Sequence, residues 1–130
     1  MNAARMRSRR VRACALAGCV ALQPLVALAA RPLWDIPGGS ARRGSERIAA
    51  LGCPACHTIP GVNNADGNVG PPLTRFGDRT YIAGMLRNTP PNLIRWIREP
   101  QAVIPGNAMP NMGISEVDAR DIAAYLYTLR

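Results

Sequence analysis

The sequence predicts a small all-α domain of about three to five helices. Apolar residues recur at helical spacing in separate segments, and no segment shows the strict apolar–polar alternation of a half-buried strand. Proline and glycine cluster within 60–72 and 100–113, which predicts two long irregular loops between the helices. With 130 residues, the chain is expected to hold one domain.

The first predicted helix covers about 42–52 and ends at Gly52, just before the cysteines. Ile48 and Leu51 lie three positions apart on its expected buried side. Arg43 and Arg47 fall on the opposite side and are expected to face solvent.

Three further helices are expected downstream. A short one is predicted at about 79–86. The next begins after Thr89, whose place before two prolines is typical of an N-cap, and ends before Pro100. Its apolar stripe consists of Leu93, Trp96 and Ile97. The last begins at Ser115, where Ser-Glu-Val-Asp has the form of a capping box, and continues to the end of the chain.

The N-terminal segment 1–30 has the features of a secretory signal peptide. Residues 1–12 contain five arginines and no acidic residue, and residues 13–30 are apolar apart from one glutamine. We therefore expect export to the periplasm. Three alternatives remain open: an uncleaved membrane anchor, lipidation at Cys19, and twin-arginine export through Arg9 and Arg10.

The charge of the remaining chain argues against nucleic-acid binding. Removing the five leader arginines from 16 basic residues leaves eleven against eight acidic ones, a net charge of +3. No basic stripe with interleaved aromatic residues remains to contact a phosphate backbone. Residues 31–41 contain two prolines and two glycines and are expected to form a flexible arm, so the predicted domain covers 42–130.

The segment Cys53-Pro54-Ala55-Cys56-His57 carries the strongest chemical signal, and His57 is the chain's one histidine. A C-x-x-C-H motif is the attachment signature of c-type haem: the two thiols form thioethers, and the adjacent imidazole is placed to bind the iron. A redox-active dithiol would need a strand before the motif, and a zinc site would need a fourth ligand that the mature chain lacks.

The small number of aromatic residues supports a bulky cofactor. One Phe, two Trp and three Tyr provide little apolar mass for a domain of this size. A buried haem would supply the missing apolar volume, which is an argument independent of the cysteine motif.

The motif order resembles that of the class I monohaem cytochrome c family over residues 42–130: a helix, C-x-x-C-H, Gly-Pro-Pro-Leu, a Trp-containing helix, a Met-Pro loop and a C-terminal helix. The stretch around 88–100 also resembles the cytochrome c module of haem–copper oxidase subunit II. This resemblance implies several helices around one covalent haem c, with the first and last helices crossing where Gly44 meets Tyr125 or Leu126.

The resemblance also implies a set of ligands. Cys53 and Cys56 would hold the haem, and His57 would be the proximal iron ligand with its second ring nitrogen bonded to the carbonyl of Pro71. Met109 would be the distal ligand, because it precedes proline as in the family's ligand loop.

Several assignments around the ligands stay open. Met85 and Met112 compete with Met109 for the distal position. Trp96 is expected either at the haem edge, as a donor to a propionate, or in the core. Arg75 and Arg95 are candidate propionate partners.

The predicted function is periplasmic one-electron transfer to or from redox partner proteins, such as a membrane oxidase or another respiratory complex, with membrane association if the N-terminus is retained. Two alternatives are a haem c subunit of a periplasmic dehydrogenase, and a haem-based sensor or peroxidase in which the bond to Met109 is weak. An apolar docking patch is expected around the exposed haem edge, formed by Ala55, Ile59, Val69, Pro110 and Met112.

Overall fold

A computed structural model describes residues 34–130, so the predicted leader lies outside the described residues. The all-α prediction is confirmed in its main part, because this region contains four α-helices and one small two-stranded sheet. In chain order the elements are α1 (Ala41–Ala50), the 3-10 helices η1 (Cys53–Ala55) and η2 (Phe76–Asp78), β1 (Tyr81–Ile82), β2 (Leu86–Arg87), α2 (Pro90–Arg98), α3 (Pro100–Val103) and α4 (Glu116–Leu126). No helix among residues 34–130 has the length and apolarity needed to cross a membrane.

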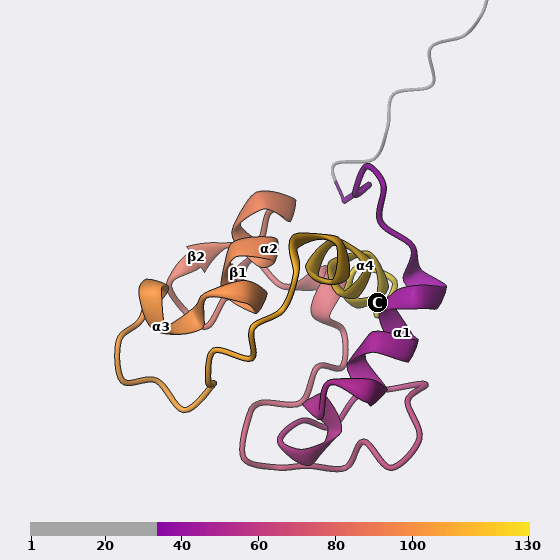
Figure 1. Ribbon diagram of the computed structural model, residues 1–130, viewed down its shortest axis with the longest axis horizontal. Coiled ribbons are helices and arrows are strands. Elements are labelled where there is room, and N and C mark those ends of the chain that lie inside the picture. Colours follow the sequence, from indigo (N-terminus) through magenta and orange to yellow (C-terminus); the bar gives the residue numbers. More distant parts are fainter. Residues whose placement is uncertain (1–33) are drawn as a thin grey trace, which may run out of the picture.

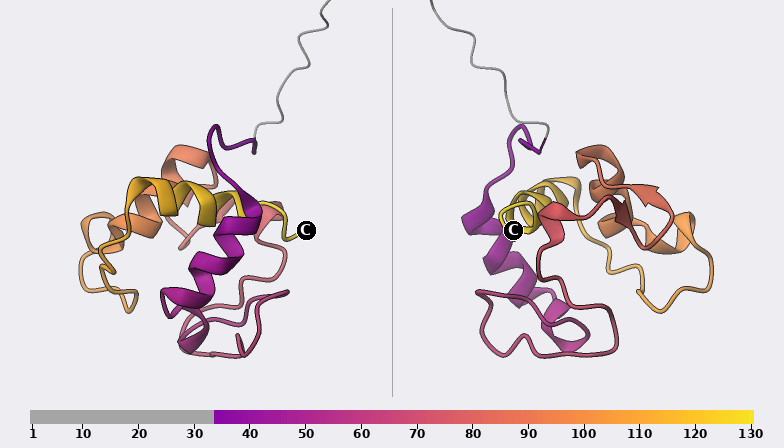
Figure 2. Two further views of the ribbon diagram at one scale, coloured as in Figure 1. Left: turned by 45° about the vertical axis from the view of Figure 1, so that its right-hand side comes forward. Right: turned by 180° about the vertical axis from the view of Figure 1, so that it is seen from behind.

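Helix α4 is the central element of the fold. It lies between α1 on one side and α2 with the β1–β2 hairpin on the other (Figures 1 and 2). The largest fully buried apolar side chains include Ile48 of α1 and Leu93 of α2, on the two sides of α4. The core around them consists of Ile36, Ile59, Ala65, Phe76, Ile82, Ile97, Ile114, Ala119, Ile122, Ala123, Leu126 and Tyr127.

The crossing of α1 and α4 occurs at Gly44, as the family resemblance implied. A Cβ atom on Gly44 would collide with the carbonyl group of Asp121 and would lie 2.9 Å from Cβ of Tyr125. Only a residue without a side chain lets the two backbones approach this closely.

The predicted helix starts are found at Thr89 and Ser115, each at the N-cap of its helix. Ser115 Oγ accepts a hydrogen bond from the amide of Asp118 (3.1 Å), as expected of a capping residue. Thr89 makes no side-chain bond, and α2 begins instead with the two prolines, which carry no amide hydrogen to satisfy.

The helix predicted at 79–86 is wrong, because this segment forms the antiparallel β1–β2 hairpin with Ile82 paired to Leu86. Ala83 and Gly84 lie between the strands with φ angles of 48° and 71°. Two successive left-handed residues reverse the chain and cannot continue a right-handed helix. Two smaller differences are the one-turn helix α3 inside the predicted loop 100–113, and the end of α4 at Leu126 before the chain terminus.

The described part of the predicted flexible arm is irregular but packed. Ile36 is only 4% exposed and belongs to the core. The guanidinium of Arg130 lies 4.2 Å from the ring centre of Trp34, which joins the arm to the C-terminus. Residues 34–40 therefore form an ordered strap against α4. The burial of Ile36 holds this strap in place, although its other residues are typical of a loop.

The two arginines expected to face solvent on α1 are exposed, as predicted, and they also reach across to α4. Arg43 donates two hydrogen bonds to the buried carboxylate of Asp121, from Nε (2.7 Å) and Nη2 (2.8 Å). Asp121 also accepts from the amide of Ser40 (2.7 Å), so it caps the start of α1 from the neighbouring helix. Arg47 forms an ion pair with Asp118 (2.8 Å). A helical pattern shows which face is polar, but not which carboxylate lies opposite.

We predict that Gly44→Ala destabilises the protein by about 1–3 kcal/mol, because the added methyl group must push the α1 and α4 backbones apart. Thermal or denaturant unfolding of the purified protein measures this difference. Ala49→Ser, which adds one atom at an exposed position of the same helix, is the control and should leave the unfolding free energy nearly unchanged. Equal stability of Gly44→Ala and the control would contradict the close crossing.

A second prediction concerns the pH dependence of stability at Asp121. The hydrogen bond from Arg43 lowers the pKa of this carboxyl group below its ordinary value of 3.8, against the opposing effect of burial. A lowered pKa contributes stability that is present above the unfolded pKa and is lost as the pH falls through the folded pKa. Asp121→Asn should therefore be less stable than the natural protein at neutral pH, and the difference should shrink below about pH 4.

Unfolding followed by circular dichroism at several pH values tests this prediction. Glu46→Gln is the matched control, since Glu46 pairs with Arg42 at 2.6 Å on an exposed part of α1. A stability gap between Asp121→Asn and the natural protein that stays constant down to pH 2 would show that the Asp121 charge is not responsible.

Candidate functional site

A cavity of about 580 Å³ lies between α1, α2, α4 and the long loops, and it collects the predicted site residues. Cys53, Cys56, His57 and Met109 all line it, although 52 residues separate the histidine from the methionine. Pro71 and Trp96 line the same cavity. The remaining lining is mostly apolar and includes Ile48, Leu51, Leu73, Phe76, Ile82, Leu93, Ile97, Ile104, Ile114, Ile122 and Leu126.

The C-x-x-C-H segment forms a tight turn directly after α1. Gly52 takes a left-handed conformation (φ 78°), which ends α1 and redirects the chain into η1. The carbonyl of Cys53 accepts hydrogen bonds from the amides of Cys56 (3.2 Å) and His57 (3.0 Å). The turn brings both sulfur atoms and the imidazole to one wall of the cavity.

The surroundings of the two cysteines do not resemble those of an oxidoreductase dithiol. Burial, and to a smaller extent the neighbouring Cys56, raises the pKa of the Cys53 thiol. Reactive C-x-x-C cysteines need the opposite, a pKa lowered at a helix N-terminus or beside a cation. Residues 34–130 also contain no group of three or more His, Cys, Asp and Glu side chains arranged to hold a metal ion, which gives the zinc alternative no support.

The His57 ring is held in a defined orientation. Its Nδ1 atom lies 2.8 Å from the carbonyl oxygen of Pro71, the partner that the family resemblance implied. A carbonyl only accepts, so Nδ1 carries the proton and Nε2 keeps a free lone pair. This is the second hydrogen bond that histidine ligands of metals usually make.

Gly70 packs against the His57 imidazole, a contact that no residue pattern predicts. A Cβ atom at position 70 would lie 2.7 Å from Nδ1 and 2.8 Å from Nε2 of the ring. The amide of Gly70 donates to the carbonyl of Cys56 (2.8 Å), which fixes this approach. The loop from 58 to 73 thereby packs against the imidazole ring and limits its movement.

The three candidate methionines occupy different positions. Met85 is 67% exposed and does not line the cavity, which removes it as a distal ligand. Met109 and Met112 both line it, but Met112 is 47% exposed whereas Met109 is half-buried. The structure therefore narrows the choice to the Met-Pro loop and favours Met109 by burial.

Neither arginine proposed as a propionate partner lines the cavity. Arg75 pairs with Asp78 (3.2 Å), and Arg95 lines a different pocket. Arg79 is the arginine that lines the cavity, with its guanidinium 5.3 Å from the ring centre of Phe76. It donates to the carbonyl oxygens of Thr74 (3.1 Å) and Pro72, and nothing in the sequence pattern distinguished it from its neighbours.

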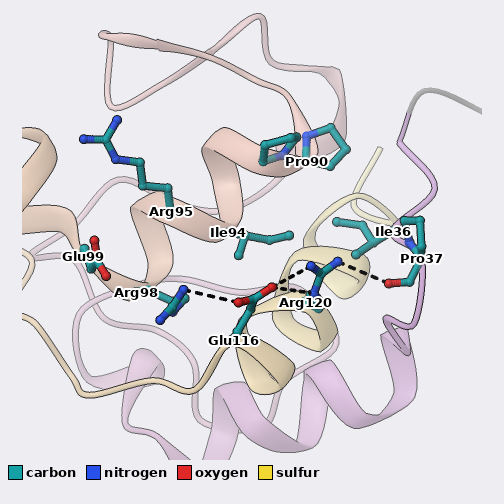
Figure 3. A pocket seen from close by; sticks show the side chains of 10 residues that line it. Ile36, Pro37, Pro90, Ile94, Arg95, Arg98, Glu99, Glu116 and Arg120 are labelled. Carbon is teal, nitrogen blue, oxygen red and sulfur yellow. Dashed lines mark hydrogen bonds and ion pairs between the residues drawn. The ribbon is translucent and has the colours of Figure 1, made fainter.

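The second pocket, of about 350 Å³, lies between the N-terminal strap, α2 and α4 (Figure 3). Glu116 points into it between Arg98 (3.7 Å) and Arg120 (2.6 Å). The hydrogen bonds from Arg120 lower the pKa of Glu116, so the carboxylate stays charged and paired. This ion-pair group joins α2 to α4 and supplies no cysteine, histidine or methionine ligand.

The expected docking patch is partly wrong. Ile59 is 2% exposed and belongs to the core. Its amide donates a hydrogen bond to the carbonyl of Ala65 (3.0 Å) within the folded loop. Val69, Pro110 and Met112 are exposed and also line the cavity, so they surround its mouth. Ala55 is exposed but is not among the lining residues.

The chain is similar to known proteins of one family. The cytochrome c family model matches residues 41–130. Cytochrome c oxidase subunit 2 of Alkalihalophilus pseudofirmus is 40% identical over 91 residues, covering 69% of this chain and 26% of that protein. The subunits of the same name from Bacillus sp. (strain PS3) and Bacillus subtilis (strain 168) are 34% and 32% identical, covering 65% and 61% of this chain and 25% and 24% of those proteins.

The chain thus spans about a quarter of the length of the relatives that it matches. The family match begins at the first residue of α1 and ends at the last residue of the chain, so it contains the crossing helices, the C-x-x-C-H turn and the methionine loop. With these features in one apolar cavity, the chain belongs to the cytochrome c family.

Proposed function

We propose that this protein is a one-electron carrier with a single haem c attached through Cys53 and Cys56 and bound at the iron by His57 and Met109. Membership of the cytochrome c family implies haem-based electron transfer. The observation that carries the residue assignment is the convergence of both thiols, the imidazole and the thioether on one apolar cavity. The cavity has the size and lining of a pocket for a large, mostly apolar ligand.

The residues have separate roles in this proposal. Haem c, when bound, supplies an iron that alternates between ferric and ferrous states. His57 presents Nε2 because Pro71 holds Nδ1–H (2.8 Å). The neutral thioether of Met109 favours the reduced state and raises the reduction potential. Arg79, which brings a positive charge to the cavity wall, is placed to balance the propionates.

His57 and Met109, if both bind the iron as proposed, would leave no free coordination position for oxygen or peroxide, which supports a carrier over a sensor or peroxidase. The apolar groups at the cavity mouth suit brief contacts with a partner, since transient redox interfaces are small. The relatives named cytochrome c oxidase subunit 2 support a respiratory oxidase as that partner. The leader-like segment 1–30 supports a periplasmic location.

Absorption spectra of the protein from a host that attaches haem c test the assignment. We predict sharp α and β bands on reduction and a weak far-red iron–methionine band when oxidised. Met109→Ala should lose the far-red band and lower the potential, whereas Met112→Ala should keep both. A protein without covalent haem would contradict the proposal. If only Met112→Ala lost the far-red band, Met112 and not Met109 would be the distal ligand.

We also predict that Gly70→Ala disturbs the proximal ligand, because the new methyl group must displace the His57 ring. We expect the bond between His57 and the iron to weaken. This would change the Soret band and make added imidazole bind to the haem iron faster. Val69→Ala is the control, since Val69 is the exposed neighbouring residue. Identical spectra of Gly70→Ala and the control would contradict the close packing of Gly70 on the ring.

A further inference from the structure

The loop that carries Met109 has no helix or strand between α3 and α4 to hold it. Residues 104–113 instead depend on two side-chain amides, those of Gln101 in α3 and Asn107 in the loop. We call this pair the amide bracket. Neither residue was singled out by the sequence, and neither is explained by the ligand set alone.

The amide bracket holds both polar backbone groups of Met109. Oδ1 of Asn107 accepts a hydrogen bond from the Met109 amide (2.8 Å). Nε2 of Gln101 donates to the Met109 carbonyl oxygen (2.8 Å). The backbone of the methionine is therefore held on both sides of its Cα atom, which sets the point and direction from which its side chain leaves the loop.

The remaining bonds of the bracket connect the loop to the core. Gln101 also donates to the carbonyl of Asn107 (2.8 Å) and accepts from the amide of Gly106 (3.0 Å). Asn107 Nδ2 donates to the carbonyls of Pro100 (3.0 Å) and Ile104 (2.6 Å). Pro100 is among the most deeply buried residues, so the bracket is tied to a rigid point.

The orientation of both amides follows from their neighbours. Each NH₂ group faces two carbonyl oxygens, which only accept, and each amide oxygen faces a backbone N–H, which only donates. A carboxylate of the same shape could not replace either amide, because it cannot donate. The two positions therefore require an amide chemically and not only sterically.

We propose that Gln101 and Asn107 are positioning residues that keep the Met109 thioether on the iron and so exclude other ligands. This inference rests on the proposed function. A neutral thioether is a weak ligand, and its retention depends on how little freedom the loop gains when the bond breaks. The bracket removes that freedom in advance, which would keep the site a carrier and prevent it from acting as a ligand sensor.

The test measures how fast cyanide binds to the oxidised holoprotein, since cyanide must replace Met109, together with the far-red iron–methionine band. Gln101→Met removes the amide at similar length, and Asn107→Asp removes the donors at constant shape. Each loses two hydrogen bonds or more, so we expect cyanide binding to become at least about tenfold faster and the far-red band to weaken. Asn92→Asp is the matched control: Asn92, in α2, donates to the carbonyl of Arg87 in β2 (2.9 Å) and does not line the cavity.

A second background separates positioning from general stability. In Met109→Ala, where no thioether remains to be held, Gln101→Met should leave the cyanide rate unchanged. A purely structural role would instead lower the unfolding temperature and change the rate equally in both backgrounds. Persistence of the effect without Met109 would therefore overturn the inference.

The remaining outcomes distinguish the inference from the function on which it rests. If the natural protein shows the far-red band and both bracket variants match Asn92→Asp, the bracket proposal fails and the carrier proposal stands. If the natural protein binds haem but shows no such band and takes up cyanide rapidly, the Met109 assignment fails and the bracket proposal fails with it.

Discussion

The contact of Gly44 on α1 with the α4 backbone at Asp121 is the constraint on which the other parts of the structure depend. Helix α1 ends at Ala50, and Gly52 turns the chain directly into the C-x-x-C-H segment, so the angle at which α1 crosses α4 also sets the position of Cys53. Helix α4 contributes Ile122 and Leu126 to the same cavity. One close helix contact therefore fixes two walls of the site, and the Arg43–Asp121 bonds hold the helices in that arrangement.

The other walls of the cavity are formed by loops. These loops have little regular secondary structure and are stabilised by specific hydrogen bonds instead. On the histidine side, the bonds run from backbone to backbone within 58–73, such as Leu73 N–H to the Thr58 carbonyl (2.8 Å). On the methionine side, the bonds come from side-chain amides. Both loops thus pair many of their polar groups, within the loop or with neighbouring elements, which lowers the cost of lining an apolar cavity with irregular chain.

The sequence predicted features whose cause is local. Periodic apolar residues, the Ser115 cap and the cysteine motif each express their structure within a few positions, and these predictions agree with the described residues. The prediction of a helix at 79–86 was wrong because residues 83 and 84 both adopt left-handed conformations, and an alanine at position 83 does not indicate such a turn. Asp121, Arg79 and Gln101 escaped notice because their partners lie at a distance along the chain or are backbone groups, which no residue pattern reveals.

The two sides of the site differ in how they would tolerate change. The imidazole side is built from groups within one turn and one loop, and Gly70 and the Pro71 carbonyl confine the ring to one orientation. The thioether side depends on two polar side chains that accept no charged or shortened substitute. Under the proposal that Met109 binds the iron, substitutions at 101 and 107 are expected to change the ligand environment that sets the reduction potential, while the helices and the C-x-x-C-H turn stay unchanged.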